Sequence, residues 1–432
     1  MLICISWEKG QVRWMFFKLL QKECMQAFKS LIYWIYVICV LLFFFTQMGS
    51  PGFDAKKPVE TEDGVYGTKI SKDEKDIQEV LLGELAQDFY EDSWTTYPAG
   101  FIKYVKIDEQ ETEEINRILE EMTGLTEKQR SMAIESFYEK GNSQSYMYSI
   151  FRLPVKEGIS YDTFKENMKK VCSILGAGSS YEESKFSQGV DVLADYEDAV
   201  AEYENLIEKD KFTRGYARLF SDYMGIVLGI MPVFVAVTRC MRDRRAKMQE
   251  LIYVRKASSA AVILSRYLSM VMTMLLPVIF AAIYTLMQCI GYTKGMNISI
   301  DYFAFVPSVF IWLLPEIMVV SALGMLLTEL TDTAIAVLVQ AVWWFSSVFV
   351  FMQAGGLASG NFGFHLVVRH NSAMDYQVFV DHYQEFIINR VFYAGLALIF
   401  VGLSVWVYSM KRKGAWDLYG KILHGSKRKS KA

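Results

Sequence analysis

LIYWIYVICVLLFFFTQMG, residues 31–49, contains no charged side chain. A helix rises about 1.5 Å per residue, so about 20 apolar residues cross the hydrocarbon core of a bilayer. The stretch therefore predicts a membrane-spanning helix. Five further segments qualify or nearly qualify by the same criterion: Tyr223–Thr238, Tyr267–Ile290, Phe303–Leu327, Ala334–Leu357 and Val391–Met410.

Charged residues separate the chain into two kinds of region. Residues 50–215 hold 20 Lys and Arg against 35 Asp and Glu, whereas the rest of the chain holds 25 against 13. The formal net charge of −3 therefore hides an acidic block set into a basic, apolar chain. We predict a mainly α-helical polytopic membrane protein with six transmembrane helices and an extracytoplasmic α+β domain inserted between the first and the second.

These segments suggest an order of domains along the chain. We expect a cytoplasmic interfacial helix at 1–30, the first span at 31–49, the extracytoplasmic domain with an N-terminal linker at 50–215, a five-helix transmembrane bundle at 216–410 with a cytoplasmic loop at 239–261, and a basic cytoplasmic tail at 411–432. Within the first of these, residues 14–28 alternate apolar and polar side chains at helical spacing, which is typical of a helix lying in the membrane interface.

Lys and Arg near the span ends set the orientation, because short loops rich in them stay in the cytoplasm. With the N-terminus inside, the inner segments hold 20 basic residues, and the two later outer loops hold only Lys294, Arg369 and Arg390. Both termini are therefore expected in the cytoplasm. A cleaved signal peptide is the alternative for the first span, but its apolar run exceeds the usual length of about 7 to 15 residues.

The acidic block contains patterns of both helices and strands. Ser71-Lys72-Asp73-Glu74 and Thr126-Glu127-Lys128-Gln129 are capping boxes that predict helix starts. The alternation in 101–107 and 146–155 predicts two strands. Helices are expected at 113–122, 126–138, 162–175 and 196–209. Only Cys172 lies in this block, so we expect it to fold without a disulfide framework.

Enzyme motifs are missing from the sequence. It has neither a G-x-x-x-x-G-K-[ST] phosphate loop nor a G-x-S-x-G nucleophile elbow. His365 and His370 lie five positions apart, on different faces of a helix, so a metal site formed with Asp381 and His382 is less favoured than ordinary loop residues. We expect no catalytic residue, metal ligand, cofactor or nucleic-acid partner, and if ATP drives this protein, another chain must hydrolyse it.

The loop after the second span is the most informative stretch: CMRDRRAKMQELIYVRKASSAAVILSRYLSM, residues 240–270. It is basic and helical in pattern. Leu251, Ile252 and Val254 lie between the charged patches 242–247 and 255–256. The plainer interpretation is a loop that only anchors the chain to anionic lipid.

In this stretch the chain resembles the permeases of ATP-binding-cassette exporters of the type-two class. In that family an acidic residue opens a short cytoplasmic helix after the second span, and a turn of small residues and a basic residue precede the third span. The corresponding places are held by Asp243, Glu250 with Leu251, Ser258-Ser259 and Arg266. The six spans, the interfacial N-terminal helix and the basic end of the last span also match. The large outer domain departs from the simplest members.

The resemblance implies the membrane subunit of an export system in the cell membrane. A second permease copy, or a homologous permease, would complete the pathway, and cytoplasmic ATPase subunits would bind ATP and Mg. The inner loop would be the coupling helix, which contacts the ATPase through Arg242, Asp243, Glu250, Leu251 and Arg255.

Two polar residues lie at membrane depth in this scheme, Arg266 and Glu316. A charge exposed to lipid at the middle of a span would cost at least about 2.5 kcal/mol, so Glu316 must face protein or water. One interpretation is a neutral or hydrogen-bonded acid that holds the bundle together beside a kink at Pro315. The other is a cavity carboxylate that binds cationic cargo or carries a proton.

Two other functions fit parts of the pattern. A membrane receptor or sensor with an extracytoplasmic ligand-binding domain needs only the spans around that domain, together with a cytoplasmic signalling domain that is not evident here. A four-span mechanotransmitting permease predicts two fewer helices. Four apolar segments beyond the two that flank the domain therefore favour transport.

Overall fold

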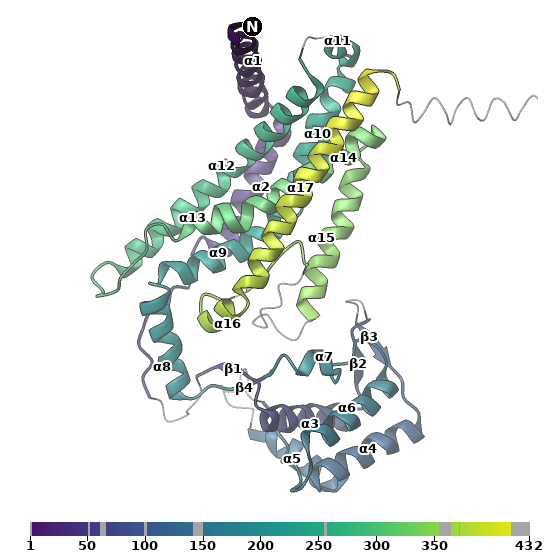
Figure 1. Cartoon of the computed structure of the whole chain (residues 1–432). Helices are drawn as coiled ribbons and strands as arrows, with labels where there is room; N and C mark the ends of the chain where they lie inside the picture. Colours follow the sequence, from purple (N-terminus) through teal and green to yellow (C-terminus); the bar gives the residue numbers. More distant parts are fainter. Residues whose placement is uncertain are drawn as a thin grey trace, which may run out of the picture.

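The computed structural model describes residues 2–50, 52–60, 66–98, 102–140, 150–254, 257–353, 364–370 and 372–415. Figure 1 shows a bundle of long helices, with the short helix α11 (Gln249–Tyr253) at one end and a smaller α+β domain beyond the other end. The bundle and the small domain each have their own hydrophobic core.

Helices from both sides of the small domain build the bundle. They are α1 (Leu2–Phe28), α2 (Leu31–Met48), α9 (Thr213–Leu228), α10 (Met231–Arg245), α12 (Ser259–Thr293), α13 (Phe305–Pro307), η4 (Ser308–Leu313), α14 (Leu314–Thr331), α15 (Ile335–Gln353), α16 (Tyr376–Asp381) and α17 (Tyr383–Arg412). The α13–α14 run is the most buried of the candidate spans, and α14 packs against α10, α12, α15 and α17.

Four helical runs in the described residues are long and apolar enough to cross a membrane: α2, α12, α13 to α14, and α17. The pair α9 and α10, bent by 43°, makes a fifth candidate if both cross as one span. The described part of α15 is apolar but shorter. The chain is thus a mainly helical polytopic membrane protein with four to five candidate spans, and the expected count of six is not confirmed.

The second expected span is a broken helix rather than one continuous segment. Gly229 and Ile230 separate α9 from α10, and Pro232 lies in the first turn of α10. Proline lacks an N–H and is favoured in the first turn of a helix, so its position here agrees with a new helix that starts after the break. Helix α9 begins at Thr213, three residues before the bundle boundary predicted at 216, and the stretch predicted as a loop at 239–261 begins inside α10.

The fourth expected span contains a π-helical segment, η4, immediately before α14. Pro315, in the first turn of α14, cannot donate the backbone hydrogen bond of a regular helical turn. A π segment accommodates such a change of register, and π segments often occur at functional positions. The expected kink at Pro315 is therefore a widened turn that precedes the proline.

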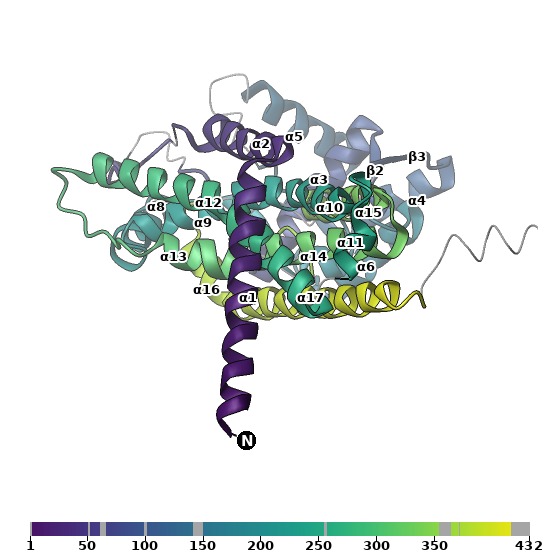
Figure 2. The ribbon, with the colours of Figure 1, turned by 90° about the horizontal axis from the view of Figure 1, so that it is seen from above.

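The N-terminal helix α1 lies within the segment 1–30 where a helix was expected, and it begins well before the alternating stretch 14–28. Figure 2 shows the first part of α1 projecting away from the bundle, and its later part contacts α12. The chain turns at Ser30, where the indole N–H of Trp34 donates to the Phe28 carbonyl at 2.8 Å. This turn separates α1 from the candidate span α2.

The small domain, residues 66–195, is closed by its own ends. β1 (Thr68–Ser71) pairs antiparallel with β4 (Val190–Leu193), with Thr68 opposite Leu193. A second sheet pairs β2 (Trp94–Thr96) with β3 (Lys103–Val105). The other elements are α3 (Glu74–Glu91), α4 (Glu109–Thr123), α5 (Glu127–Lys140), α6 (Tyr161–Leu175) and α7 (Glu183–Phe186), and α8 (Tyr196–Glu204) and η3 (Asn205–Lys209) lead to α9.

Two predictions for this domain are wrong in detail. Helix α3 is capped by Asp73, whose carboxylate accepts from the backbone N–H groups of Lys75 and Asp76, whereas Ser71 ends β1. Of the expected strand at 146–155, residues 150–155 adopt no regular structure and 146–149 lie outside the described residues.

Residues 150–155 pack against helix α3 and do not pair with any strand in the described part of the chain. The N–H of Leu153 donates to the Glu79 carbonyl of α3 at 3.0 Å. A Cβ added at Gly83 of α3 would lie 2.2 Å from the Phe151 carbonyl oxygen. The absence of a side chain at Gly83 thus lets the extended segment pack directly on the helix backbone.

We expect residues 66–195 to fold alone, because the domain has a separate core and its ends pair with each other. Gly83→Ala should lower the free energy of unfolding of the isolated fragment by about 1–3 kcal/mol, the usual cost of overpacking. Urea unfolding followed by circular dichroism measures the difference. Lys75→Ala, on the exposed side of α3, is the control and should change little. A wild-type fragment without a cooperative transition would show that the domain needs the bundle.

Candidate functional site

The short helix α11 lies between α10 and α12 at the end of the bundle farthest from the small domain (Figure 1). Its outward surface carries Glu250, which is exposed, and Leu251, which is 60% exposed. Val254, directly after the helix, is 81% exposed. These neighbouring apolar side chains are available for contact with another molecule. The predicted coupling residues Glu250 and Leu251 are therefore accessible.

The inward side of α11 attaches it to the bundle. The ring of Tyr253 meets that of Tyr408 on α17 edge to face, with 5.4 Å between the centroids. Gln249 and Ile252 line a narrow space of about 20 Å³ together with Arg266 of α12. A displacement of α11 would therefore press on side chains of at least two bundle helices.

A network of ion pairs lies beneath α11. Asp243 accepts from Arg242 of its own helix at 3.1 Å and from Arg266 of α12. Buried Arg266 also lies 3.7 Å from Glu329 of α14. Arg242, Asp243 and Arg266, predicted as separate features, thus belong to one network. The resemblance predicted that Asp243 opens the short helix. This prediction is wrong, because Asp243 lies within α10.

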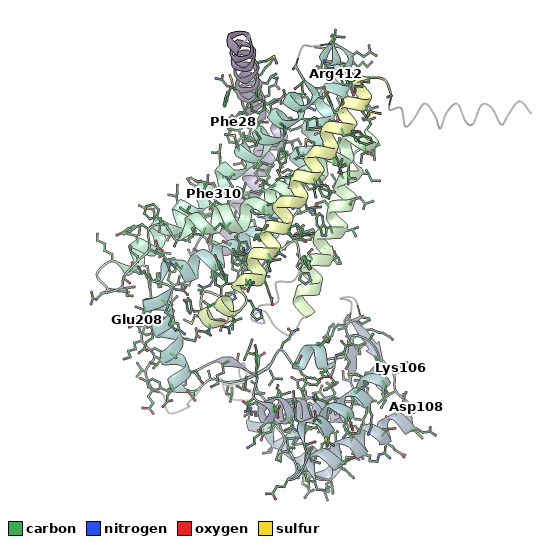
Figure 3. The ribbon with its side chains drawn as sticks, viewed as in Figure 1. Phe28, Lys106, Asp108, Glu208, Phe310 and Arg412 are labelled. Carbon is green, nitrogen blue, oxygen red and sulfur yellow. The ribbon has the colours of Figure 1, made fainter. Side chains whose placement is uncertain are left out.

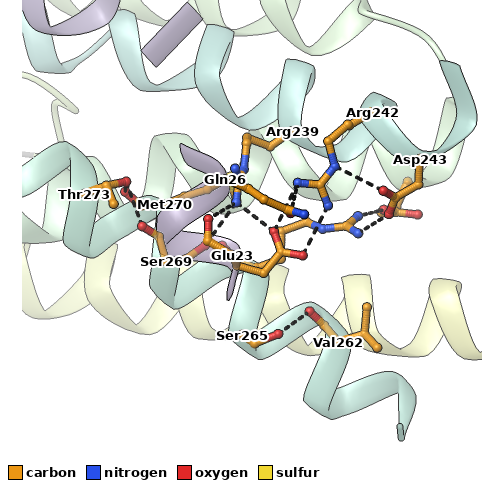
Figure 4. Close-up of polar contacts among 12 residues, drawn as sticks. Glu23, Gln26, Arg239, Arg242, Asp243, Val262, Ser265, Ser269, Met270 and Thr273 are labelled. Carbon is orange, nitrogen blue, oxygen red and sulfur yellow. Dashed lines mark hydrogen bonds and ion pairs between the residues drawn. The ribbon is translucent and has the colours of Figure 1, made fainter. Parts of the chain in front are cut away.

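Glu23 of α1 extends this network to the N-terminal helix (Figure 4). Its carboxylate lies 2.7 Å from Arg239 and 3.2 Å from Arg242. Arg239 also donates to the Glu23 backbone carbonyl at 2.8 Å. Sequence reasoning missed Glu23, although an acidic residue in the basic segment 1–30 was a signal that a basic partner should be sought.

A second cluster of ion pairs joins the ends of α10, α14 and α17. Asp332, directly after α14, lies 2.5 Å from Arg244 and 2.6 Å from Lys411 of α17. Arg412 donates to the Ala257 carbonyl at 2.6 Å, shortly before α12 begins. The two clusters link α1, α10, α12, α14 and α17 around the base of α11.

Ion pairs of this kind constrain movement. Removing one partner of a buried pair typically costs about 3–5 kcal/mol, because the other charge is left without compensation, and the pair of Arg266 with Asp243 comes nearest to this case. The carboxylates of Glu23, Asp243 and Asp332 each meet two basic side chains, and in every case at least one of these comes from another helix. The helices at this end can therefore move together as one unit. If one helix moves relative to another, the ion pairs between them must exchange partners.

Glu316 is fully buried and pairs with Arg390 of α17 at 3.5 Å. Arg390, also buried, donates in addition to the carbonyls of Trp312 and Leu366 at 3.2 and 3.0 Å and to the side chain of Asn389 at 2.9 Å. The pair joins α14 to α17 inside the bundle. The sequence had placed Arg390 only at the entrance of the last span, so this partner was missed.

Two glycines, one in α9 and one directly after it, leave room for the Glu316 carboxylate. A Cβ at Gly225 would lie 3.4 Å from its Oε2, and a Cβ at Gly229 would lie 3.0 Å from its Oε1. At the same break between α9 and α10, Gln340 and Trp344 of α15 donate to the carbonyls of Gly229 and Ile226 at 2.6 and 2.8 Å. The side chains of α15 thus satisfy backbone groups that the broken helix leaves unpaired.

Of the other residues that the sequence singled out, those that the structure describes take no part in the ion-pair network. Arg255 lies outside the described residues. Ser258 caps α12 by accepting from the Ala261 N–H, which agrees with the predicted turn of small residues. His370 contacts the Met374 carbonyl through its ring at 3.1 Å. Within the described part of the chain, no group of three His, Cys, Asp or Glu side chains is arranged to hold a metal ion.

We expect the pair of Glu316 and Arg390 to contribute to stability mainly by mutual compensation. Glu316→Leu and Arg390→Met should each destabilise the purified protein by about 3–5 kcal/mol, whereas the double variant should recover most of the loss. Thermal unfolding in detergent measures this. Arg214→Met is the control, because Arg214 pairs with Asp301 at an exposed site and such pairs are worth about 0–1 kcal/mol. Single variants as stable as the wild type would contradict the assignment.

Glu316→Gln tests the other interpretation of this carboxylate. A cavity carboxylate predicts normal expression with transport lost or its pH dependence flattened, because the variant keeps the shape and loses the charge. A purely structural group predicts unchanged transport. A transport assay at several pH values separates the two.

Comparison with known proteins identifies the family. The model of the ABC-2 family transporter proteins matches residues 28–368, which is most of the chain. Comparisons with curated proteins and with solved structures gave no match. The family match includes α2, the small domain, the broken pair, α11, α12, α14 and α15, and it does not favour the receptor alternative. The chain is a membrane component of a transporter and belongs to the ABC-2 family of transporter proteins.

Proposed function

We propose that this chain is the permease subunit of an ATP-driven export system, moved through α11 by a separate cytoplasmic ATPase that binds ATP and Mg. The observation that carries the proposal is the placement of α11, which presents Glu250, Leu251 and Val254 outward and rests on the charged network inward. Family membership supports the proposal, since ABC-2 permeases typically work with an ATP-binding-cassette ATPase.

The proposed coupling has two steps. In the first step, Leu251 and Val254 enter an apolar depression of the ATPase. Glu250 and the basic residue Arg255, nearby in sequence, form ion pairs that fix the position of α11 on the ATPase surface. Movement of the ATPase then displaces α11 and, through Arg242 and Asp243, the helices that share the network. Such a network favours two discrete arrangements over continuous deformation, as alternating access requires.

The proposed topology has six spans with both termini in the cytoplasm of a bacterial cell. The broken pair α9 and α10 forms the second span and α15 the fifth. Basic residues gather at the α11 end, where Figure 3 labels Arg412, and the acidic domain with Lys106 and Asp108 lies at the opposite end. The positive-inside rule supports a cytoplasmic α11 and an extracytoplasmic small domain.

A complete transporter would contain two permeases, either two copies of this chain or this chain with a homologous partner, above two ATPase subunits in the lipid bilayer. In this scheme, the breaks at Gly229 and in η4 are the points at which the bundle can bend. Outward transport is proposed from the family resemblance.

Single-cysteine labelling tests the topology. In a cysteine-free background, cysteines at Lys72 and Lys294 should react with an impermeant thiol reagent in intact cells, because both sites are exposed and outside in the proposed arrangement. A cysteine at Arg245, which is equally accessible in the structure, should react only after the membrane is opened. Labelling at Arg245 from outside would overturn the orientation.

Substitution on α11 tests the coupling. Leu251→Asp and Glu250→Lys should leave membrane insertion intact and reduce co-purification of the ATPase that associates with the wild-type permease by about tenfold, as expected when an interface residue worth more than 1 kcal/mol is lost. ATP-dependent transport in vesicles should fall in parallel. Quantitative affinity pull-down of the tagged permease measures the association.

Arg245→Glu is the matched control, since it lowers the charge of the same loop at an exposed site outside α11. Coupling through α11 predicts a mild effect of this control. If the loop only anchors the chain to anionic lipid, Arg245→Glu should reduce transport and Glu250→Lys should leave it unchanged. That result would refute the proposed coupling.

A further inference from the structure

A cavity of about 560 Å³ lies at the small-domain end of the bundle, between α9, the α13–η4 segment and α16–α17. It is separate from α11 and from the ion-pair network beneath α11. A volume of this size is typical of sites that enclose a small organic ligand or a single acyl chain. No function discussed above uses this cavity.

Aromatic side chains form the inner wall of the cavity. The Trp312 ring is stacked parallel to Phe379, with 6.1 Å between the centroids, and lies 4.6 Å from Phe386. At the outer edge, Phe303 and Ile311 are 75% and 41% exposed on the apolar surface of a predicted span. The wall therefore continues from the protein interior to the surface that faces lipid, and a ligand with an apolar body could enter from the bilayer.

Polar groups at the cavity are mainly paired, and the buried ones left over are donors. Arg218 forms a two-pronged ion pair with Asp210, at 2.7 and 2.6 Å, but its Nε is buried without a partner among the described residues. The indole N–H of buried Trp312 also lacks an acceptor there. Half-exposed Arg214 adds a cation beside Asp301, which it contacts at 2.7 Å.

Unpaired buried donors favour a ligand that supplies acceptor oxygens. An unsatisfied buried N–H is unfavourable, whereas a bond from a charged donor to an anionic oxygen is among the stronger hydrogen bonds in proteins. The two carboxylates, Asp210 and Asp301, are paired with Arg218 and Arg214, so the buried polar atoms of the described cavity lining still without a partner are the N–H donors of Arg218 and Trp312. The lining thus combines an apolar channel with a donor-rich end.

We infer that this cavity binds an anionic amphiphile: an apolar chain lies against Trp312, Phe379 and Phe386, and an anionic oxygen headgroup lies at Arg214 and Arg218. The amphiphile is either a free single-chain molecule or one chain and the headgroup of a membrane phospholipid. As the substrate class of the transporter, this inference rests on the proposed function. As a binding site, it stands without it.

Photo-crosslinking to the purified full-length permease, without ATPase, tests the site directly. The probes are a diazirine-bearing dodecyl phosphate, a diazirine-bearing phosphatidylglycerol and a diazirine-bearing dodecyl trimethylammonium. Peptide mass spectrometry should find the label from the phosphate probe concentrated in 303–312 and 376–386. Preference for dodecyl phosphate over phosphatidylglycerol identifies a free amphiphile, and the reverse identifies a membrane lipid.

Ile311→Trp fills the cavity and should reduce this labelling by about tenfold, because a filled pocket excludes the chain. Phe310→Trp is the matched control: the residue is adjacent, 47% exposed and absent from the cavity lining, so labelling should persist. Thermal unfolding confirms that both variants are folded.

Arg214→Gln provides a second variant in case Ile311→Trp does not fold. It should lower the preference for the phosphate over the ammonium probe by about tenfold, as for the loss of one charge-assisted hydrogen bond. Label spread evenly over all lipid-facing helices, or unchanged by both variants, would overturn the site and leave only an interfacial belt of aromatic residues. Failure of the proposed transport function would instead appear as lost ATPase association with this labelling intact.

Discussion

Each buried arginine in the bundle requires a carboxylate from another part of the chain, and this requirement decides how the helices meet. Arg239 needs Glu23 of α1, Arg266 needs Asp243 of α10, and Arg390 needs Glu316 of α14. A charge buried in the protein without a partner is costly, so these pairs restrict how the helices can be aligned with one another. The short helix α11 rests on this arrangement.

The second constraint concerns backbone groups at the breaks in the helices. Inside a membrane, every freed carbonyl needs a donor, because water is not available there. The break between α9 and α10 is tolerated because Gln340 and Trp344 donate to its carbonyls. The glycine that forms the break, Gly229, also gives the Glu316 carboxylate its space. A bend in one helix, a buried acid in a second and polar side chains on a third thus depend on one another.

The junction between the small domain and the bundle is also specialised. Lys211 and Phe212 both have positive φ angles, 47° and 57°, a conformation that non-glycine residues rarely adopt. Phe212 is fully buried and stacks on Tyr292 of α12 with 5.5 Å between the rings. Packing therefore holds this strained turn in place and fixes the direction in which η3 enters α9. The same turn places Asp210 against Arg218, beside the cavity that we assign to an amphiphile.

The sequence by itself determined the membrane class, the acidic domain between the first and second apolar segments, the short helical segment before the third, and the exclusion of Glu316 from lipid. Each follows from local composition, helical periodicity or the cost of a charge in lipid. Only the tertiary structure decided that Arg242, Asp243 and Arg266 form one network, that Glu23 completes it, and that Arg390 is the partner of Glu316. These residues are brought together by helices that are distant in the chain, and no local pattern records which pairs will meet. The break at Gly229 and the extended segment packed on Gly83 likewise depended on contacts with other elements, which override local preference.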